Sequence, residues 1–112
     1  MASEQQPLAI AYSPAALEEL DEIWRWNAER YSPAHADAYV SFLQSRIERL
    51  AHDHDRGRRI TGREDLRYII ILRRPKSHGH VAVYSVHECE VFILHVFHTA
   101  QDWGRKLRDE DR

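Results

Sequence analysis

HVAVYSVHECEVFILHVFH, at residues 80–98, contains two apolar runs, HVAVYSVH and EVFILHVFH, separated only by Glu88 and Cys89. Both runs are rich in β-branched and aromatic residues, which favour strands. A two-residue connection is typical of a hairpin, although Glu-Cys is a weaker turn sequence than Asn-Gly. We therefore expect a β-hairpin here, and its last strand, apolar on both faces, should lie inside a covered sheet.

The expected pairing divides the histidines of this hairpin between the two faces of the sheet. With Glu88 and Cys89 as the turn, His95 lies opposite Ala82 on the face that carries His80, whereas His98 lies on the other face. The first face then carries His80, Ala82, Tyr84, Val86, Val91, Ile93, His95 and Phe97. The sequence has neither C-x-x-C nor H-x-x-x-H spacing, so we expect no metal site, and no motif indicates a cofactor.

Two helices are predicted before this hairpin, because the tetrapeptide YSPA occurs at residues 12–15 and again at 31–34. Serine accepts a hydrogen bond from an early helical N–H, and proline fits the first helical position. The first helix, about 14–30, should pack through Leu17, Leu20, Ile23 or Trp24, with Glu18, Glu19, Asp21 and Glu22 toward water. The second, about 33–52, should pack through Ala36, Tyr39, Leu43, Ile47 and Leu50. Their short connection makes them an antiparallel helical hairpin.

The other segments complete a β-α-α-β-β-β order. LAIAY (8–12) and RYIIILR (67–73) resemble strands, and the polar residues 51–66 lack any period and indicate a loop. The tail should form a short helix capped by Thr99, with Asp102 three residues later. We expect one α+β domain over 1–112, with an ordered core over about 8–108, in which the helical hairpin packs on a small, mostly antiparallel sheet.

Composition restricts the class of protein. A single cysteine, Cys89, excludes an internal disulfide and fits a reducing compartment. The N-terminal residues do not resemble a signal peptide, and no apolar run reaches the length of a membrane helix. The sequence therefore predicts a cytoplasmic protein without membrane contact.

Charge is unevenly distributed along the chain. Residues 1–55 carry four Lys or Arg and ten Asp or Glu, a balance of −6, whereas residues 56–112 carry twelve and eight, a balance of +4. The basic excess is concentrated at residues 56–76. This asymmetry indicates a nucleic-acid partner or an acidic protein partner, and the alternative is a solvated loop with a basic rim.

Several segments, taken in order, resemble a known family. They are LEELDEIWRW (17–26), ADAYVSFLQSRIERLA (36–51), a loop rich in glycine and arginine, a strand that opens near Arg67, HVAVYSV (80–86) and VFILHVFHTAQDW (91–103). Together they are similar to the RelE/ParE superfamily of bacterial toxins, and closest to its ParE, or plasmid stabilisation, branch. The resemblance covers residues 8–108.

This resemblance implies a growth-inhibiting toxin of a type II toxin–antitoxin system, which a cognate antitoxin neutralises by direct binding. ParE-like members act on DNA gyrase, and RelE-like members are ribosome-dependent mRNA endonucleases. A third alternative is an inactive member that serves as an interaction module or co-repressor. In none of these do we expect sequence-specific DNA binding except through the antitoxin.

The resemblance also supplies candidate residues for each alternative. Nuclease candidates are Glu64, Arg67, Arg73, His80, Tyr84 and His98. Thr99 follows His98 where some nucleases have further catalytic residues, so the nuclease pattern is incomplete and we favour a non-enzymatic toxin. Candidates for target binding are Arg63, Arg67, His98, Asp102 and Trp103.

The first helix supplies candidates for the antitoxin contact. Trp26 falls about 200° around the helix from Trp24, so Trp24 should pack and Trp26 should be exposed. An exposed tryptophan is typical of a protein interface. Candidates for antitoxin binding are Trp26, Glu22, Tyr31 and Arg73, although a single exposed aromatic ring is also common on surfaces without partners.

Overall fold

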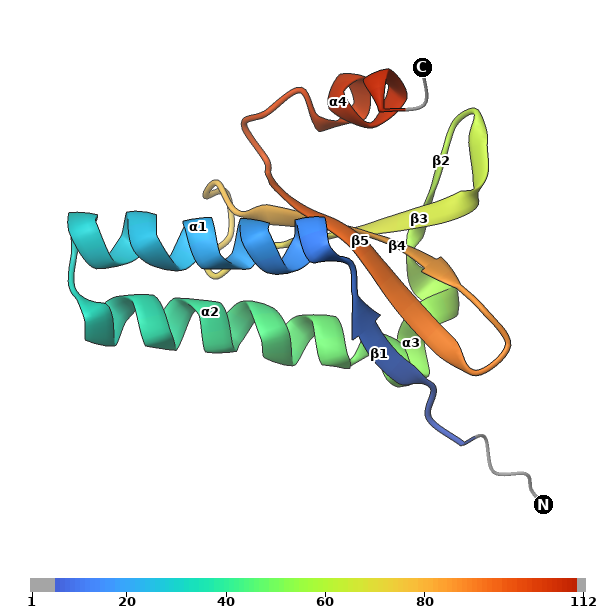
Figure 1. The fold of residues 1–112 in the computed structure, drawn as a ribbon, viewed down its shortest axis with the longest axis horizontal. Coiled ribbons are helices and arrows are strands. Elements are labelled where there is room, and N and C mark those ends of the chain that lie inside the picture. The colour runs from blue at the N-terminus through green and yellow to red at the C-terminus, as the bar shows by residue number, and fades with distance from the viewer. Residues whose placement is uncertain (1–5, 111–112) are drawn as a thin grey trace.

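A five-stranded mixed sheet lies between the helical hairpin and the C-terminal helix in the computed structural model, which describes residues 6–110 (Figure 1). The elements are β1 (Ala9–Tyr12), α1 (Pro14–Arg30), α2 (Pro33–Glu48), α3 (Leu50–Asp53), a 3₁₀ turn (His54–Arg56), β2 (Arg58–Ile60), β3 (Arg63–Ile71), β4 (His80–Val86), β5 (Glu90–His98) and α4 (Trp103–Asp109). The strand order is β1-β5-β4-β3-β2, and only the β1–β5 pair is parallel. The predicted α+β architecture is confirmed.

Both copies of YSPA begin a helix, as predicted. Ser13 Oγ accepts a hydrogen bond from Ala16 N at 2.9 Å, and Ser32 Oγ accepts one from His35 N at 3.1 Å. Proline follows each serine in the first helical turn. The Ser13 hydroxyl also donates to the carbonyl oxygen of Leu94 at 2.6 Å. The first copy therefore joins α1 to the sheet as well as capping the helix.

The helical hairpin packs on the sheet through most of the expected side chains. Its buried residues are Ala16, Leu20, Asn27, Ala36, Leu43 and Ile47, followed by Leu50 at the start of α3. Leu17 is 54% exposed, so its prediction as a packed residue was wrong. Trp26 is 56% exposed and Trp24 is half-buried, which confirms the predicted contrast between them.

The pairing of β4 with β5 departs from the predicted register at a β-bulge. Val86 pairs with Val91 and Tyr84 with Ile93 as expected, but Val83 pairs with His95, which leaves Leu94 without a partner. Beyond this bulge every residue of β5 is displaced by one position, and a displacement of one residue exchanges the two faces. The predicted positions of His95 and His98 were therefore wrong.

Because of the bulge, His95 and His98 each lie on the face of the sheet opposite to the one predicted. His98 pairs with His80 and shares its face, which is the side covered by α1 and α2. His95 lies on the other face, where its ring stacks on Phe97 with centroids 4.5 Å apart. The imidazoles are still divided between the faces, but the pair that meets is His80 with His98.

Residues 51–66 were wrongly predicted as a loop. They contain most of α3, the 3₁₀ turn, the whole of β2 and the start of β3. The strands were missed because β2 is a charged edge strand without an apolar alternation, and pairing with β3 rather than its own pattern defines it. Gly62, with a φ of 83°, provides the tight turn between them.

The cap of the C-terminal helix was also wrongly assigned. Asp102, not Thr99, caps α4, because its carboxylate accepts a hydrogen bond from Arg105 N at 3.4 Å. The Thr99 hydroxyl instead accepts a hydrogen bond from Gly79 N at 3.0 Å. α4 packs through Leu107 and Trp103 on the sheet face opposite the helical hairpin, against a cluster that includes Leu66, Val81, Val83 and Phe97. Among residues 6–110 no helix is long and apolar enough to cross a membrane.

The two YSPA copies provide a matched test of this packing. Ser32→Ala removes only a helix cap and should lower the free energy of unfolding by about 1 kcal/mol. Ser13→Ala also leaves the Leu94 carbonyl without its donor, so it should cost roughly 1 kcal/mol more than Ser32→Ala. Urea unfolding of both variants measures the difference. Equal losses would contradict a role of Ser13 in holding the bulge.

Candidate functional site

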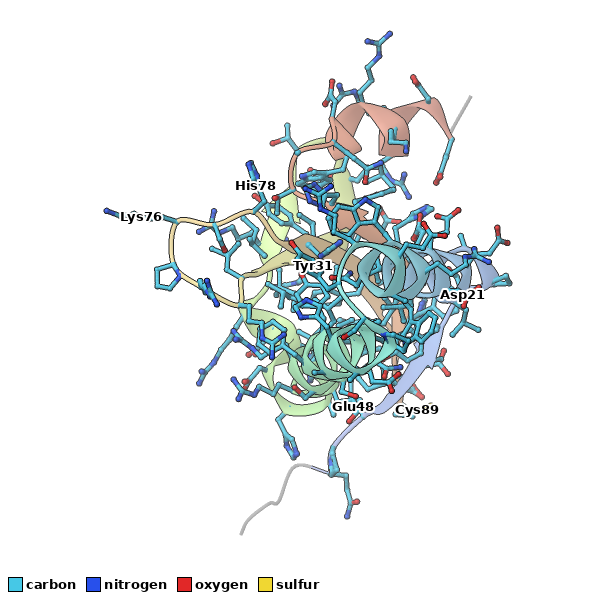
Figure 2. All side chains as sticks on the ribbon, turned by 90° about the vertical axis from the view of Figure 1, so that its left-hand side faces the viewer. Asp21, Tyr31, Glu48, Lys76, His78 and Cys89 are labelled. Carbon is cyan, nitrogen blue, oxygen red and sulfur yellow. The ribbon has the colours of Figure 1, made fainter. Side chains whose placement is uncertain are left out.

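A cleft of about 1200 Å³ opens where the helical hairpin, the β3–β4 loop and the end of β5 meet. Figure 2 faces this side of the molecule, with Tyr31 at the end of the helical hairpin and His78 on the loop above it. The lining of the cleft includes Glu19, Glu22, Ile23, Trp26, Asn27, Tyr31, His35, Tyr39, Arg73, Arg74, His78, His80, His98 and Lys106.

Histidine rings and one tyrosine form the inner end of this cleft. The hydroxyl of Tyr39 on α2 and Nδ1 of His80 on β4 are hydrogen-bonded at 2.7 Å. The His80 and His98 rings meet edge to face with centroids 5.2 Å apart, and His78 lies 5.9 Å from His98. Burial, with a smaller contribution from the neighbouring His98, lowers the pKa of His80 to about 4. His80 is therefore neutral at pH 7.

Aromatic rings line the outer end of the cleft, where the helical hairpin turns. The Trp26 and Tyr31 centroids are 6.2 Å apart in an edge-to-face arrangement, and Tyr31 lies 4.4 Å from the ring of His35. The guanidinium of Arg30 lies 5.6 Å from the Trp26 ring centroid. These contacts hold an exposed aromatic surface in place, and such surfaces are typical of protein interfaces.

Charge differs between the two sides of the cleft. Glu19 and Glu22 lie on the α1 side, whereas Arg73 and Arg74 lie on the β3–β4 loop opposite. The Arg73 guanidinium is 5.8 Å from the Phe42 ring centroid, so this arginine is directed back over α2. A segment with aromatic or apolar side chains and acidic groups would find complementary contacts here.

The six nuclease candidates do not converge on one site. Arg73, His80 and His98 line the cleft. Glu64 and Arg67 border a different hollow of about 420 Å³, near the β4–β5 turn. Tyr84 is fully buried, and its hydroxyl donates to the carbonyl of His54 at 2.7 Å.

Arg67 has a structural contact in the fold. Its guanidinium donates to the backbone carbonyls of Asp55 at 2.7 Å and Gly57 at 3.3 Å. Together with the Tyr84 hydroxyl, it fixes the segment that leads from α3 into β2. Tyr84 and Arg67 therefore stabilise the same connection from neighbouring strands.

The five candidates for target binding do not form one surface. Arg63 forms an ion pair with Asp65 at 3.2 Å on the exposed β2–β3 hairpin. Trp103 is half-buried, with its ring 4.8 Å from that of Tyr68. Asp102 caps α4, while His98 lines the cleft on the opposite face. By contrast, the four candidates for antitoxin binding all line the cleft, namely Trp26, Glu22, Tyr31 and Arg73.

Several cleft residues were not identified from the sequence. Tyr39 was assigned only to the packed stripe of the second helix, yet its hydroxyl fixes His80. The available signals were the hydroxyl of Tyr39 on an apolar stripe and the position of His80 at the start of a buried strand, because buried polar groups need hydrogen-bond partners. No local sequence pattern indicated that His78 or Lys106 would line the cleft. Among residues 6–110 no three His, Cys, Asp or Glu side chains are grouped so that they could hold a metal ion.

The depressed pKa of His80 makes a prediction about acid stability. Between pH 6.5 and pH 4 the unfolded chain takes up a proton that folded His80 does not, so the stability falls as pH drops through this range. The full effect amounts to roughly 3 kcal/mol. In His80→Gln this loss should disappear, whereas His87→Gln, at an exposed histidine, should keep it. Urea unfolding at pH 7 and pH 4.5 measures the loss of stability in each variant. Equal losses in His80→Gln and His87→Gln would contradict the prediction.

Comparison with known proteins agrees with the fold and with the resemblance seen in the sequence. A solved structure described as the chromosomal ParDE TA system from P. aeruginosa superposes with a TM-score of 0.70 at 19% identity, covering 84% of this chain and 98% of that one. Toxin RelE3 of Caulobacter vibrioides is 29% identical over 93 residues, which cover 83% of this chain and 96% of the relative. The family model for the ParE toxin of type II toxin–antitoxin system, parDE, matches residues 10–103. The chain therefore belongs to the ParE toxin family, within the RelE/ParE superfamily of type II toxin–antitoxin systems.

Proposed function

We propose that this toxin arrests growth by binding DNA gyrase without catalysing a reaction, and that a cognate antitoxin neutralises it by occupying the cleft. The observation that carries the first part is the separation of the six nuclease candidates. The four antitoxin candidates, which share one cleft, support the second part. Both partners are cytoplasmic in this proposal, which fits the exposed, unpaired thiol of Cys89.

RNA cleavage requires a base at the ribose hydroxyl, a cation at the phosphate and an acid at the leaving oxygen, all around one phosphodiester. In this fold Tyr84 is enclosed and Arg67 is bound to two backbone carbonyls. Only Arg73, His80 and His98 remain near one another, and His80 is neutral and buried. These positions favour a binding function over the nuclease alternative.

The gyrase proposal is tested with purified components. We expect the toxin to inhibit supercoiling by DNA gyrase and the cognate antitoxin to restore it. Messenger RNA incubated with ribosomes and the toxin should stay intact. Ribosome-dependent cleavage that is lost in Arg73→Ala or His98→Ala would contradict the proposal and support the nuclease alternative. Normal growth after induction without the antitoxin would instead support an inactive interaction module.

The cleft suits a partner segment with aromatic or apolar side chains and carboxylates. Trp26 and Tyr31 offer ring surfaces at the open end, and Arg73 and Arg74 offer two cations on the opposite side. A disordered acidic tail that folds on binding could place both kinds of group along this length. The antitoxin contact therefore depends on the aromatic end of the helical hairpin.

Trp26 and Leu17 form a matched pair for testing the antitoxin contact, because both are apolar residues of α1 and are 56% and 54% exposed. Trp26 lines the cleft and Leu17 does not. Trp26→Ala should weaken antitoxin binding by roughly 10-fold or more, as expected for an interface tryptophan. Leu17→Ala should change the dissociation constant less than about threefold. Titration calorimetry with the antitoxin measures both dissociation constants. Equal changes in Trp26→Ala and Leu17→Ala would contradict the assignment of Trp26 to the antitoxin contact.

A further inference from the structure

His95 lies between two carboxylates that belong to different helices. Its Nδ1 is 3.0 Å from Glu19 Oε2 on α1, and its Nε2 is 2.8 Å from Glu110 Oε1, directly after α4. The His95 residue is 7% exposed. One imidazole on β5 thus connects the helical hairpin with the C-terminal helix, and these helices lie on opposite faces of the sheet.

The two carboxylates are held with different strength. Glu19 has a second contact, because its Oε1 accepts a hydrogen bond from Val96 N at 2.8 Å. The Glu110 side chain is 51% exposed and belongs to the residue that follows the short helix α4. The hydrogen bond between His95 and Glu110 is therefore weaker than that between His95 and Glu19 and breaks first.

The surroundings of His95 within residues 6–110 are mostly uncharged. On its own strand the neighbouring ring is Phe97, and Lys106 of α4 lies with its Nζ 5.9 Å from the centroid of that ring. The residue that pairs with it on β4 is the uncharged Val83. Among residues 6–110, the charged groups with contacts at His95 or at the Phe97 ring stacked on it are Glu19 from α1 and Glu110 and Lys106 from the α4 side.

The protonation state of the ring determines how many contacts it can make. A carboxylate only accepts hydrogen bonds, so both contacts require both ring nitrogens to donate, as they do in imidazolium. Neutral imidazole has one N–H, and its other nitrogen would place a lone pair against a carboxylate. The hydrogen bond to Glu19 raises the pKa of His95 above 6.5, burial opposes this rise, and the hydrogen bond to Glu110 adds to it.

We propose that His95 is a proton-dependent clasp that holds the C-terminal end of α4 against the sheet and releases it when the ring becomes neutral. Protonated His95 donates to Glu19 and Glu110 together, and neutral His95 keeps Glu19 and loses Glu110. α4 then keeps the packing of Leu107 and Trp103 and the contact of Lys106 with Phe97. Because Lys106 and Glu19 also line the cleft, release of α4 changes the surface that the cleft presents to a partner.

The test follows the His95 ring and α4 in the same full-length protein. Histidine ring chemical shifts give the protonation of His95, and amide exchange at Glu110 reports the last turn of α4, since the Glu110 N–H donates to the carbonyl of Lys106. The hydrogen bond from His95 to Glu110 is stable below pH 6.5 and is lost as pH rises through the raised pKa of folded His95. We expect amide protection to fall roughly three- to tenfold over that rise.

Two neighbouring carboxylates separate the clasp from a general charge effect. In Glu110→Ala, which leaves no side-chain acceptor for His95, protection of α4 should be low at pH 6 and should not change further with pH. Asp109→Ala removes the same charge one residue earlier, from a side chain that is exposed, and should keep the wild-type pH dependence. The proposal is wrong if protection follows the same pH curve in wild type and Glu110→Ala. It is also wrong if His95 titrates at or below 6.5 in the wild type. Neither readout involves gyrase or the antitoxin, so failure here would leave the proposed function intact.

Discussion

The bulge at Leu94 is the constraint on which the rest of the structure depends. β1 pairs with β5 only as far as Ile93, so the backbone of β5 beyond that point lacks a neighbouring strand on this side. The start of α1 supplies the missing partners, since Ser13 donates to the carbonyls of Ile93 and Leu94, and Glu19 accepts from Val96 N. Unpaired backbone groups in such a position would be costly. The strand can therefore accommodate an extra residue, and the position of α1 is fixed by it.

The exchange of faces after the bulge determines the surroundings of both His95 and His98. His98 turns toward His80 and Tyr39 and closes the inner end of the cleft, while His95 turns toward α4. In the unbulged register His98 would have pointed away from the cleft, and His95 would have lain under the helical hairpin without access to Glu110. The same backbone feature thus shapes the cleft that we propose as the antitoxin site on one face of the sheet and the proposed His95 clasp on the other.

Local patterns predicted the parts of this fold that local physics determines. The two YSPA caps, the packed stripe of α2 and the exposure of Trp26 followed from spacing alone. The bulge did not, because Val83, Leu94 and Val96 are all apolar and a strand covered on both faces has no alternation to reveal its register. β2 was missed because its residues are charged and only its partner makes it a strand.

The candidate site was predictable to a similar extent. The predicted exposure of Trp26 indicated one cleft residue, but the sequence did not distinguish Glu19 from the solvated acids beside it on α1. Its role comes from contacts with Val96 and His95, more than 70 residues away along the chain. Tyr84 and Arg67 had suitable chemistry for a nuclease, yet their hydrogen bonds to backbone carbonyls were visible only in three dimensions.

The pairing of β4 with β5 is the most direct test of this account, and it can be measured from cross-strand nuclear Overhauser effects in the isotopically labelled protein. The bulged register predicts contacts that place Val83 opposite His95 and Ala82 opposite Val96. A continuous ladder, with Ala82 opposite His95 and Val83 opposite Leu94, would contradict it and would remove the basis for both the histidine arrangement in the cleft and the clasp on α4.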